Sequence, residues 1–240
     1  MKVLSINGVS KEYPGFQLNN VTFSVEKGTI MGFVGRNGAG KSTTLKSILN
    51  MVHMDSGSVT FFDLDLKENE SEIKQRIGYT GGAVDFYKKQ KIKVLIDTTK
   101  RFYKNWDDNV CEKYMKMFSL DEKKTPSELS EGMKVKLNLV FALSHGAELL
   151  ILDEPTSGLD PVSRMELIEI FKHLRTKGIS VLFSTHIISD LEKCADEITY
   201  IRDGNIIYTG DIAGFIGKNE SLENALIEYE KEVLYEKFAD

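Results

Sequence analysis

The chain has 240 residues, a formal net charge of −5 at pH 7 and an apolar fraction of 41%. This length suits one large domain with room for an inserted subdomain, and we predict a single domain over residues 1–240. The acidic balance, without a basic stripe, argues against nucleic acid as the main partner.

The first part of the chain has the pattern of a small β-subdomain. Short segments rich in strand-forming residues predict strands over residues 3–9, 21–25 and 57–62. Turn sequences separate them, such as Glu26-Lys27-Gly28 and Asp55-Ser56-Gly57.

Between the second and third of these strands lies the pattern of a phosphate-binding loop. The apolar run at 30–34 predicts a buried strand, and residues 43–50 predict a helix. The segment that joins them, Gly35-Arg36-Asn37-Gly38-Ala39-Gly40-Lys41-Ser42, fits the pattern G-x-x-x-x-G-K-[ST]. Backbone N–H groups of such a turn and of the helix N-terminus form an anion site. A plain strand–turn–helix without a ligand is the alternative.

The residue types in this loop indicate a nucleotide and Mg²⁺. A lysine at position 41 places a positive charge on the β- and γ-phosphates, and the hydroxyl at position 42 can ligate Mg²⁺. The predicted nucleotide-binding residues of this segment are Gly35, Asn37, Gly38, Ala39, Gly40, Lys41, Ser42 and Thr43.

Between about 85 and 145 the sequence becomes more polar and helical in pattern. Helices are predicted over Val94–Tyr103, Val110–Phe118 and Met133–Leu143. We therefore expect a helical subdomain inserted into an α/β core. The insert begins with a basic cluster that fits a solvated helix face, made of Lys88, Lys89, Lys91 and Lys93.

From residue 148 onward, strands and helices alternate. The predicted strands are Leu149–Leu152, Ile179–Phe183 and Ile198–Ile201, with a helix from residue 161 and another before the last strand. This alternation implies parallel strands joined by crossover helices. Asp203-Gly204-Asn205 predicts a hairpin turn, and an acid-rich helical tail is expected over about 211–240.

The strand over 149–152 ends in two carboxylates. Residues at the end of a parallel strand face the crevice that also holds the phosphate loop. Asp153 therefore suits Mg²⁺, and Glu154 suits a general base or a group that positions the attacking water. Asp160-Pro161 has the pattern of a helix N-cap followed by proline at the first helical position, which is compatible with a functional role for Asp160.

Two further candidates stand beside predicted strands. His186 follows the apolar run Val181-Leu182-Phe183, which directs it toward the terminal phosphate, where imidazole can hold transition-state charge. Tyr13 precedes Pro14-Gly15 and is the best candidate for a platform on which adenine stacks, with Phe16 in reserve. The alternative for each residue is a structural role.

No apolar run approaches the roughly 20 residues of a bilayer-spanning helix, and the chain has no recognisable signal peptide. Cys111 and Cys194 lie far apart and lack the spacing of a metal site, which indicates reduced thiols in a cytosolic protein. We therefore expect no transmembrane segment, so that a membrane process would require another polypeptide to span the bilayer.

Together these residues resemble the ATP-binding cassette (ABC) ATPases along nearly the whole chain. Gly35 to Ser42 resembles the Walker A loop, Asp153-Glu154 the end of Walker B, and Ser157 to Asp160 the D-loop. Leu129-Ser130-Glu131-Gly132-Met133 resembles the family signature, most often written LSGGQ. The resemblance implies an α/β fold: a P-loop NTPase core with a parallel sheet, an N-terminal antiparallel β-subdomain and an inserted α-helical subdomain.

The resemblance also implies the activity, ATP hydrolysis coupled to transport, with ATP and Mg²⁺ bound. The implied catalytic residues are Glu154, Lys41 and the switch histidine His186, and the implied metal-binding residues are Ser42 and Asp153. Tyr13 resembles the adenine-stacking aromatic of the family.

The partners follow from the same resemblance. In this family the signature Ser and second Gly, here Ser130 and Gly132, bind the γ-phosphate held by the opposite subunit. Asp160 would join the nucleotide site from the D-loop. The active unit is thus a head-to-tail dimer, a homodimer or a heterodimer with a second ABC ATPase, bound to a separate transmembrane permease subunit. Its place would be cytoplasmic, peripheral on the inner face of the cell membrane.

Two departures from the family pattern bear on function. Glu131 and Met133 replace the commoner Gly and Gln, a variant that resembles bacterial export-type cassettes. At the Q-loop position the chain has Gly82, where the family places Gln or an acidic residue. Glycine offers no side chain to Mg²⁺ or to water, and Asp85, Gln90 or a bound water are the candidates to substitute.

Two functions remain open. The first is the ATPase subunit of a transporter, most similar to exporters of drugs, antibiotics or amphipathic peptides, as the signature and residues 102–107 suggest. The second is a regulatory cassette that binds ATP and dimerises but hydrolyses it weakly, paired with a competent second cassette. Glu154, His186 and the signature favour the first, and Gly82 favours the second.

The transported substrate is not encoded in this chain. The membrane partner is expected to dock around residues 82–104, where Phe86-Tyr87 and the basic cluster fit a groove for a short helix. A merely solvated loop is the alternative.

Overall fold

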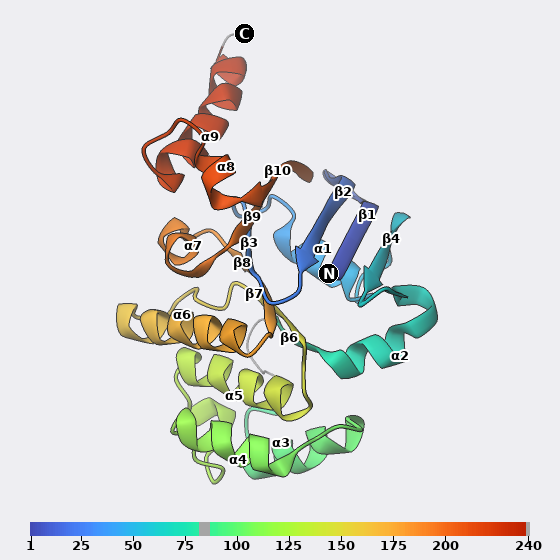
Figure 1. Ribbon diagram of the computed structural model, residues 1–240, viewed down its shortest axis with the longest axis vertical. Coiled ribbons are helices and arrows are strands. Elements are labelled where there is room, and N and C mark those ends of the chain that lie inside the picture. The colour runs from blue at the N-terminus through green and yellow to red at the C-terminus, as the bar shows by residue number, and fades with distance from the viewer. Residues whose placement is uncertain (82–86, 239–240) are drawn as a thin grey trace.

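Two β-sheets organise the protein. The computed structural model describes residues 1–81 and 87–238, with side chains as far as residue 231 (Figure 1). One sheet has the strand order β2-β1-β4-β5, and the other has the order β10-β9-β3-β8-β7-β6. The first consists of β1 (Lys2–Tyr13), β2 (Phe16–Glu26), β4 (Ser56–Phe61) and β5 (Leu64–Asp65). The second consists of β3 (Ile30–Val34), β6 (Ile77–Gly81), β7 (Leu149–Asp153), β8 (Ser180–Thr185), β9 (Glu197–Arg202) and β10 (Asn205–Asp211).

Helices connect these strands and cover the second sheet. Within the described residues, no helix is long and apolar enough to cross a membrane. The α-helices are α1 (Lys41–Ile48), α2 (Leu66–Arg76), α3 (Ile92–Thr99), α4 (Asp108–Met117), α5 (Glu131–Ser144), α6 (Pro161–Thr176), α7 (Ile188–Cys194), α8 (Ile212–Ile216) and α9 (Leu222–Phe238).

The first sheet is antiparallel, as the resemblance implies. The three predicted strands form, but the first two extend to a hairpin turn at Pro14-Gly15 and are longer than predicted. The sequence did not predict β5 or α2. Only Leu66 and Ile73 of α2 are buried, so this helix lacks the apolar stripe by which helices are recognised.

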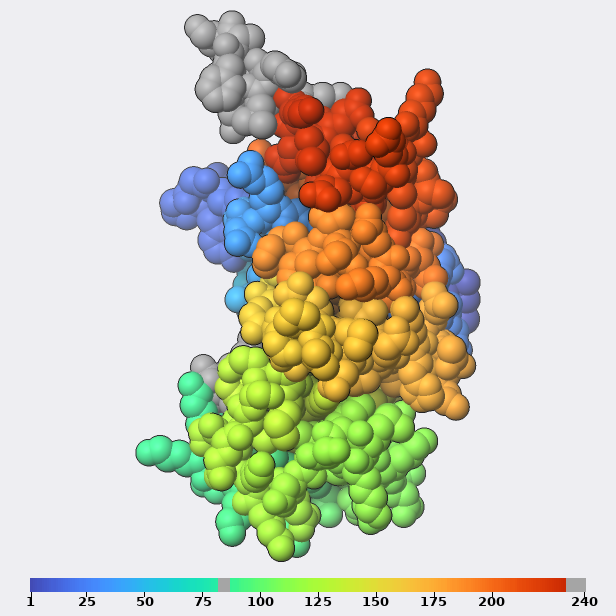
Figure 2. Space-filling view, turned by 90° about the vertical axis from the view of Figure 1, so that its left-hand side faces the viewer, coloured from blue at the N-terminus to red at the C-terminus, as the bar shows by residue number. Residues whose placement is uncertain are grey.

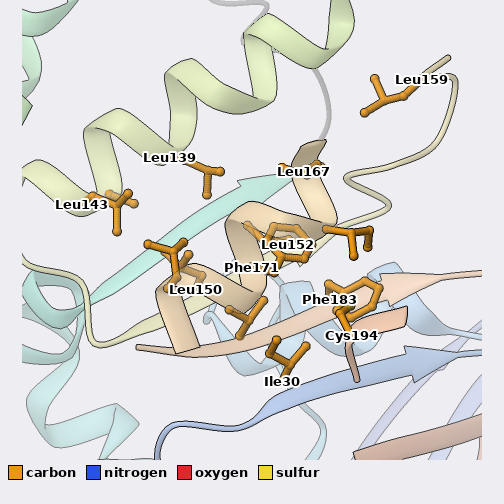
Figure 3. Packing of buried hydrophobic residues seen from close by; sticks show 14 of the residues in the cluster. Ile30, Leu139, Leu143, Leu150, Leu152, Leu159, Leu167, Phe171, Phe183 and Cys194 are labelled. Carbon is orange, nitrogen blue, oxygen red and sulfur yellow. The ribbon is translucent and has the colours of Figure 1, made fainter. Parts of the chain in front are cut away.

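The second sheet is parallel except for β10, which pairs antiparallel with β9. Leu150 and Leu152 of β7 pack in one cluster with α5 and α6, as Figure 3 shows. Leu149 and Ile151 belong to a second cluster that includes α1 and the first sheet. The strand is thus buried on both faces, which requires apolar residues at successive positions and explains the continuous apolar run.

The helices α3, α4 and α5 gather at the end of the molecule opposite the C-terminal helices (Figure 1). From the side, residues of α6 and α7 lie between these two ends (Figure 2). The three predicted helices form within residues 92–144. However, α3 ends at Thr99, and residues 100–102 form a 3₁₀ turn instead of the predicted continuation to Tyr103.

The C-terminal part packs on β9 through aromatic residues. The predicted hairpin turn forms at Asp203 and Gly204, which both have positive φ. The ring of Phe215 in α8 lies 5.9 Å from that of Tyr200 in β9 and 5.0 Å from that of Tyr229 in α9. Because Phe215 and Tyr200 are buried, these contacts anchor the start of the tail to the second sheet.

Candidate functional site

A cavity of about 690 Å³ opens where β3, β7 and β8 end. Its walls come from the turn between β1 and β2, from the phosphate loop, and from the segments that follow β7 and β8. The lining residues are Gly15, Phe16, Asn37, Gly38, Gly40, Lys41, Ser42, Thr43, Glu154, Ser157 and His186. Most of the nucleotide-binding residues predicted from the loop pattern therefore line one cavity.

In the phosphate loop, two glycines have positive φ and the lysine side chain bonds to the backbone of the loop itself. Gly38 and Gly40 have φ values of 85° and 111°, which residues with a Cβ rarely adopt. A Cβ on Gly40 would also lie 2.7 Å from Leu18 Cδ2. The ammonium group of Lys41 donates a hydrogen bond of 2.7 Å to the carbonyl oxygen of Gly35. No described side chain caps the start of α1, so its first N–H groups remain available to an anion.

Glu154 contacts both of the other predicted catalytic side chains, Lys41 and His186. Glu154 Oε1 lies 3.1 Å from Lys41 Nζ, and its Oε2 lies 2.8 Å from His186 Nδ1. A carboxylate only accepts, so Nδ1 carries the proton of this hydrogen bond and Nε2 is the ring nitrogen that Glu154 does not engage. The side chain of Lys41 is 5% exposed and that of Glu154 is 24% exposed, so the ion pair between them is largely shielded from water.

Sequence reasoning did not identify Ser184, which joins this cluster from β8. Its hydroxyl donates a hydrogen bond of 2.6 Å to Asp153 Oδ1 and accepts one of 2.8 Å from the backbone N–H of Glu154. The available signal was a hydroxyl residue that follows the apolar run Val181-Leu182-Phe183 and stands two positions before His186.

Hydroxyl and carboxylate oxygens suit Mg²⁺, and Ser42 and Asp153 provide them. The described residues contain no group of three or more His, Cys, Asp or Glu side chains placed to hold a metal. Mg²⁺ usually keeps several waters and takes only one or two protein ligands beside substrate phosphates, so the two oxygens of Ser42 and Asp153 would suffice for it. Burial, together with the nearby Asp153 carboxylate, raises the pKa of Tyr79 in the neighbouring strand β6.

Tyr13 and Phe16 face each other across the hairpin that ends β1 and begins β2. Phe16 lines the cavity, whereas Tyr13 lies outside its lining and is 38% exposed. Lys11 Nζ lies 5.6 Å from the centroid of the Tyr13 ring. The structure thus brings the reserve aromatic to the cavity and leaves the preferred one beside it, and the adenine-stacking role of Tyr13 stays a prediction.

The signature segment lies apart from this cavity. Ser130 is exposed and begins α5, where its hydroxyl accepts a hydrogen bond of 3.3 Å from the N–H of Met133. Gly132 is buried, and a Cβ there would lie 3.3 Å from Ser163 Cβ. One chain therefore does not bring Ser130 and Gly132 to its own phosphate loop.

Asp160 caps α6, as its position before Pro161 predicts. Its carboxylate accepts hydrogen bonds from the N–H groups of Val162 and Ser163, at 3.0 and 3.1 Å. Hydrogen bonds from Ser163 hold the pKa of Asp160 below its usual value. Asp160 is outside the cavity lining too.

The Q-loop position lies at the edge of the described structure. Gly82, Asp85 and Phe86 fall outside the described residues. Gln90 is exposed, and its N–H donates a hydrogen bond to the Tyr87 carbonyl oxygen.

Residues 18–157 match the sequence family described as "ABC transporter". The chain is 32% identical over 212 residues to the ABC transporter ATP-binding protein YtrB of Bacillus subtilis, covering 88% of this chain and 72% of YtrB. It is 31% identical over 237 residues to the lantibiotic transport ATP-binding protein SrtF of Streptococcus pyogenes, covering 98% and 99% of the two chains. It is 32% identical over 193 residues to the bacitracin transport ATP-binding protein BcrA of Bacillus licheniformis, of which it spans 63%.

Solved structures of ABC transporter ATP-binding subunits have the same fold as this chain. An ATP-binding subunit of an ABC transporter superimposes with a TM-score of 0.84 at 25% identity, covering 94% of this chain and 98% of that one. A nucleotide-free ATP-binding cassette superimposes with a TM-score of 0.76 at 24% identity, covering 88% and 92% of the two chains, which shows the shared fold.

Proposed function

The chain belongs to the ABC transporter family as an ATP-binding subunit, and we propose that it hydrolyses ATP in a site that a second subunit completes. ABC cassettes of this kind are ATPases coupled to transport. The observation that carries the proposal is the division of the site. Glu154 contacts Lys41 and His186 at the phosphate cavity, while the signature serine lies outside the cavity lining.

The chemistry follows from the contacts in this cluster. The triphosphate binds the loop N–H groups, the start of α1 and Lys41, which exchanges its contact with Glu154 for the phosphates. Mg²⁺ near Ser42 and Asp153 would neutralise phosphate charge when bound. Glu154 orients a water and takes up its proton as the water oxygen attacks the γ-phosphorus in line. The bond from this phosphorus to the bridging oxygen breaks, and ADP and phosphate are released.

His186 has two roles in this scheme. Its Nδ1–H holds the Glu154 carboxylate at 2.8 Å, which fixes the direction of the base. Its ring can also share charge that develops on the terminal phosphate. Phosphoryl transfer needs little covalent help, so positioning and charge stabilisation account for most of the rate.

The second subunit supplies the signature in this proposal. Ser130 is exposed at the start of α5, where backbone N–H groups favour an anion, as expected if it meets the γ-phosphate of another chain. Two chains in head-to-tail arrangement would then enclose two ATP molecules. The partner can be a second copy or a different cassette.

A separate transmembrane subunit would carry the substrate. The relatives SrtF and BcrA are named for lantibiotic and bacitracin transport, and we infer that this chain serves export of a similar class, amphipathic peptide antibiotics. The membrane partner would dock around residues 82–104, of which the structure describes 87–104; there Tyr87 and Phe102 are 57% and 71% exposed beside basic residues. The protein would then act at the inner face of the membrane.

The test is complementation between two inactive variants. Ser130→Ala and Glu154→Gln should each reduce ATP turnover by about 100-fold or more. An equimolar mixture should recover activity, because a mixed dimer has one site with an intact Glu154 from one chain and an intact Ser130 from the other. Turnover per subunit of the unmodified chain should rise with protein concentration.

Matched unfolding temperatures for the variants would ensure that each is folded. If both variants are inactive and their mixture does not recover, the composite site is wrong. A negligible rate of the unmodified chain with ATP still bound would favour the second candidate, a weakly hydrolysing cassette. Gly82→Gln is then the decisive change, since a large gain in turnover would locate the defect at the Q-loop position.

A further inference from the structure

Ser184 is a buried hydroxyl at the end of β8 that contacts both carboxylate residues of the site. Side chains alternate along a strand. Phe183 packs against Phe171 of α6 (Figure 3). Their ring centroids are 5.6 Å apart. Ser184 therefore points to the opposite face of the sheet, the face on which the phosphate loop and α1 lie.

The two hydrogen bonds of Ser184 hold consecutive residues of the neighbouring strand. In the parallel pairing of β7 and β8, Asp153 is the register partner of Ser184. The hydroxyl donates to the Asp153 carboxylate at 2.6 Å and accepts from the Glu154 N–H at 2.8 Å. One side chain thus fixes the direction of the Asp153 carboxylate and the orientation of the peptide between the two residues.

The backbone of Glu154 needs such a restraint. Its φ is 51°, in the left-handed region that residues with a Cβ rarely adopt. This conformation directs the side chain toward Lys41 and His186, which hold its two oxygens at 3.1 and 2.8 Å. Without the bond from its N–H to Ser184, the residue is free to relax toward a commoner conformation, which would move the carboxylate.

We propose that Ser184 is a positioning residue for ATP hydrolysis, which sets the Asp153 carboxylate for Mg²⁺ and the Glu154 carboxylate for water. This inference rests on the proposed function of the site. Ser184 acts through its two neighbours and not on the substrate.

The chain contains a matched control on the same strand. Ser180 is also fully buried in β8, and its hydroxyl accepts a hydrogen bond of 2.8 Å from the N–H of Gly28. It stands at the other end of the strand, away from the cavity. Ser180→Ala therefore removes the same group from the same strand and reports what the loss of a buried hydroxyl does to folding alone.

The experiment compares Ser184→Ala, Ser184→Thr and Ser180→Ala in the full chain. We expect Ser184→Ala to lower kcat by about 10–100-fold, since small misplacements of reacting groups have effects of this size. ATP affinity in EDTA should change less than about threefold, because Lys41 and the loop are intact. The gain in ATP affinity on adding Mg²⁺ should shrink, and half-maximal activity should need more Mg²⁺. Ser184→Thr, which keeps the hydroxyl, should restore kcat at least partly.

Two outcomes would overturn the inference. One is a Ser184→Ala variant with unchanged kcat and unchanged Mg²⁺ dependence. The other is an equal loss of kcat in Ser180→Ala at an equal fall in unfolding temperature. The Glu154→Gln variant separates this result from the proposed function. If Glu154→Gln is inactive and Ser184→Ala has normal activity, only the positioning role of Ser184 is refuted. Full activity of Glu154→Gln would instead refute the proposed hydrolytic site.

Discussion

The contact between Lys41 and Glu154 makes a prediction about ATP affinity. Lys41 Nζ lies 3.1 Å from Glu154 Oε1 and is almost buried. A triphosphate requires the same ammonium group, so Glu154 competes with it in the free protein and repels it in the complex. Glu154→Gln removes both effects and keeps a side chain of the same shape. We therefore expect this variant to bind ATP more tightly while it loses turnover.

The structure sets the size of the effect. Two unit charges at this separation interact by roughly 5 kcal/mol at an effective dielectric constant of about 20. Lys41 also donates to the carbonyl oxygens of Gly35 and Arg36, at 2.7 and 3.2 Å, so it keeps partners when Glu154 is changed. A hydrogen bond to a charged group contributes about 1.5–3 kcal/mol net, and the amide of glutamine retains part of it. We expect a gain of about 1–2 kcal/mol, or a roughly 5–30-fold lower dissociation constant.

The assay is calorimetric or fluorescence titration with ATP, at low protein concentration and in EDTA, so that dimer closure does not contribute. Glu148→Gln is the control. Glu148 precedes β7 and pairs with Arg76 at 2.7 Å, so this change removes the same charge at the other end of the strand and should leave ATP affinity unchanged. Equal or weaker ATP binding by Glu154→Gln would refute the competition.

Two further predictions concern the adenine site and the acid response. Tyr13→Ala should weaken ATP binding by roughly 5-fold or more, as loss of a stacked base does, and leave tripolyphosphate binding unchanged. A loss confined to Phe16→Ala would instead assign the adenine to the residue that lines the cavity. Burial lowers the pKa of His145. Below about pH 6.5 the unfolded chain therefore binds a proton at this residue more readily than the folded protein does. The contribution of His145 to the unfolding free energy should therefore fall as pH falls from about 6.5, by at most about 1.4 kcal/mol per pH unit. Denaturant titrations across this range should show a shallower fall for His145→Gln than for the unmodified chain, and an equal fall in the two proteins would contradict the prediction.

Much of the fold was predictable because the central strands of the second sheet, β3, β7 and β8, are buried and contain apolar runs. Strand β7 extends only one residue beyond its predicted end, whereas β6 lacks such a run and was not predicted. Prediction failed where burial is partial. Helix α2 has just Leu66 and Ile73 buried and depends on Asp65, whose carboxylate accepts hydrogen bonds from the next turn. Asp65 is therefore the local signal for the start of this helix.

The candidate site shows a different limit. The phosphate loop, the two carboxylates and His186 are recognisable because each belongs to a short motif whose chemistry is known. Ser184 is not, because its role depends on being opposite Asp153 in the pairing of β7 and β8. Tyr13 and Phe16 are likewise cross-strand partners, and the local sequence does not say which of them lines the cavity.

Strand register also explains why one chain holds only part of the proposed site. Val34 pairs with Thr185, and Asp153 pairs with Ser184, so β3, β8 and β7 end at the same edge of the sheet. The phosphate loop, the carboxylates and His186 leave the sheet together there, whatever the rest of the chain does. Ser130 instead begins α5, at the end of the helical insert, and stays outside that cavity. We therefore expect ATP to bind a single chain through groups fixed by the sheet, while in the proposed dimer completion of the site would depend on where the second subunit places its insert.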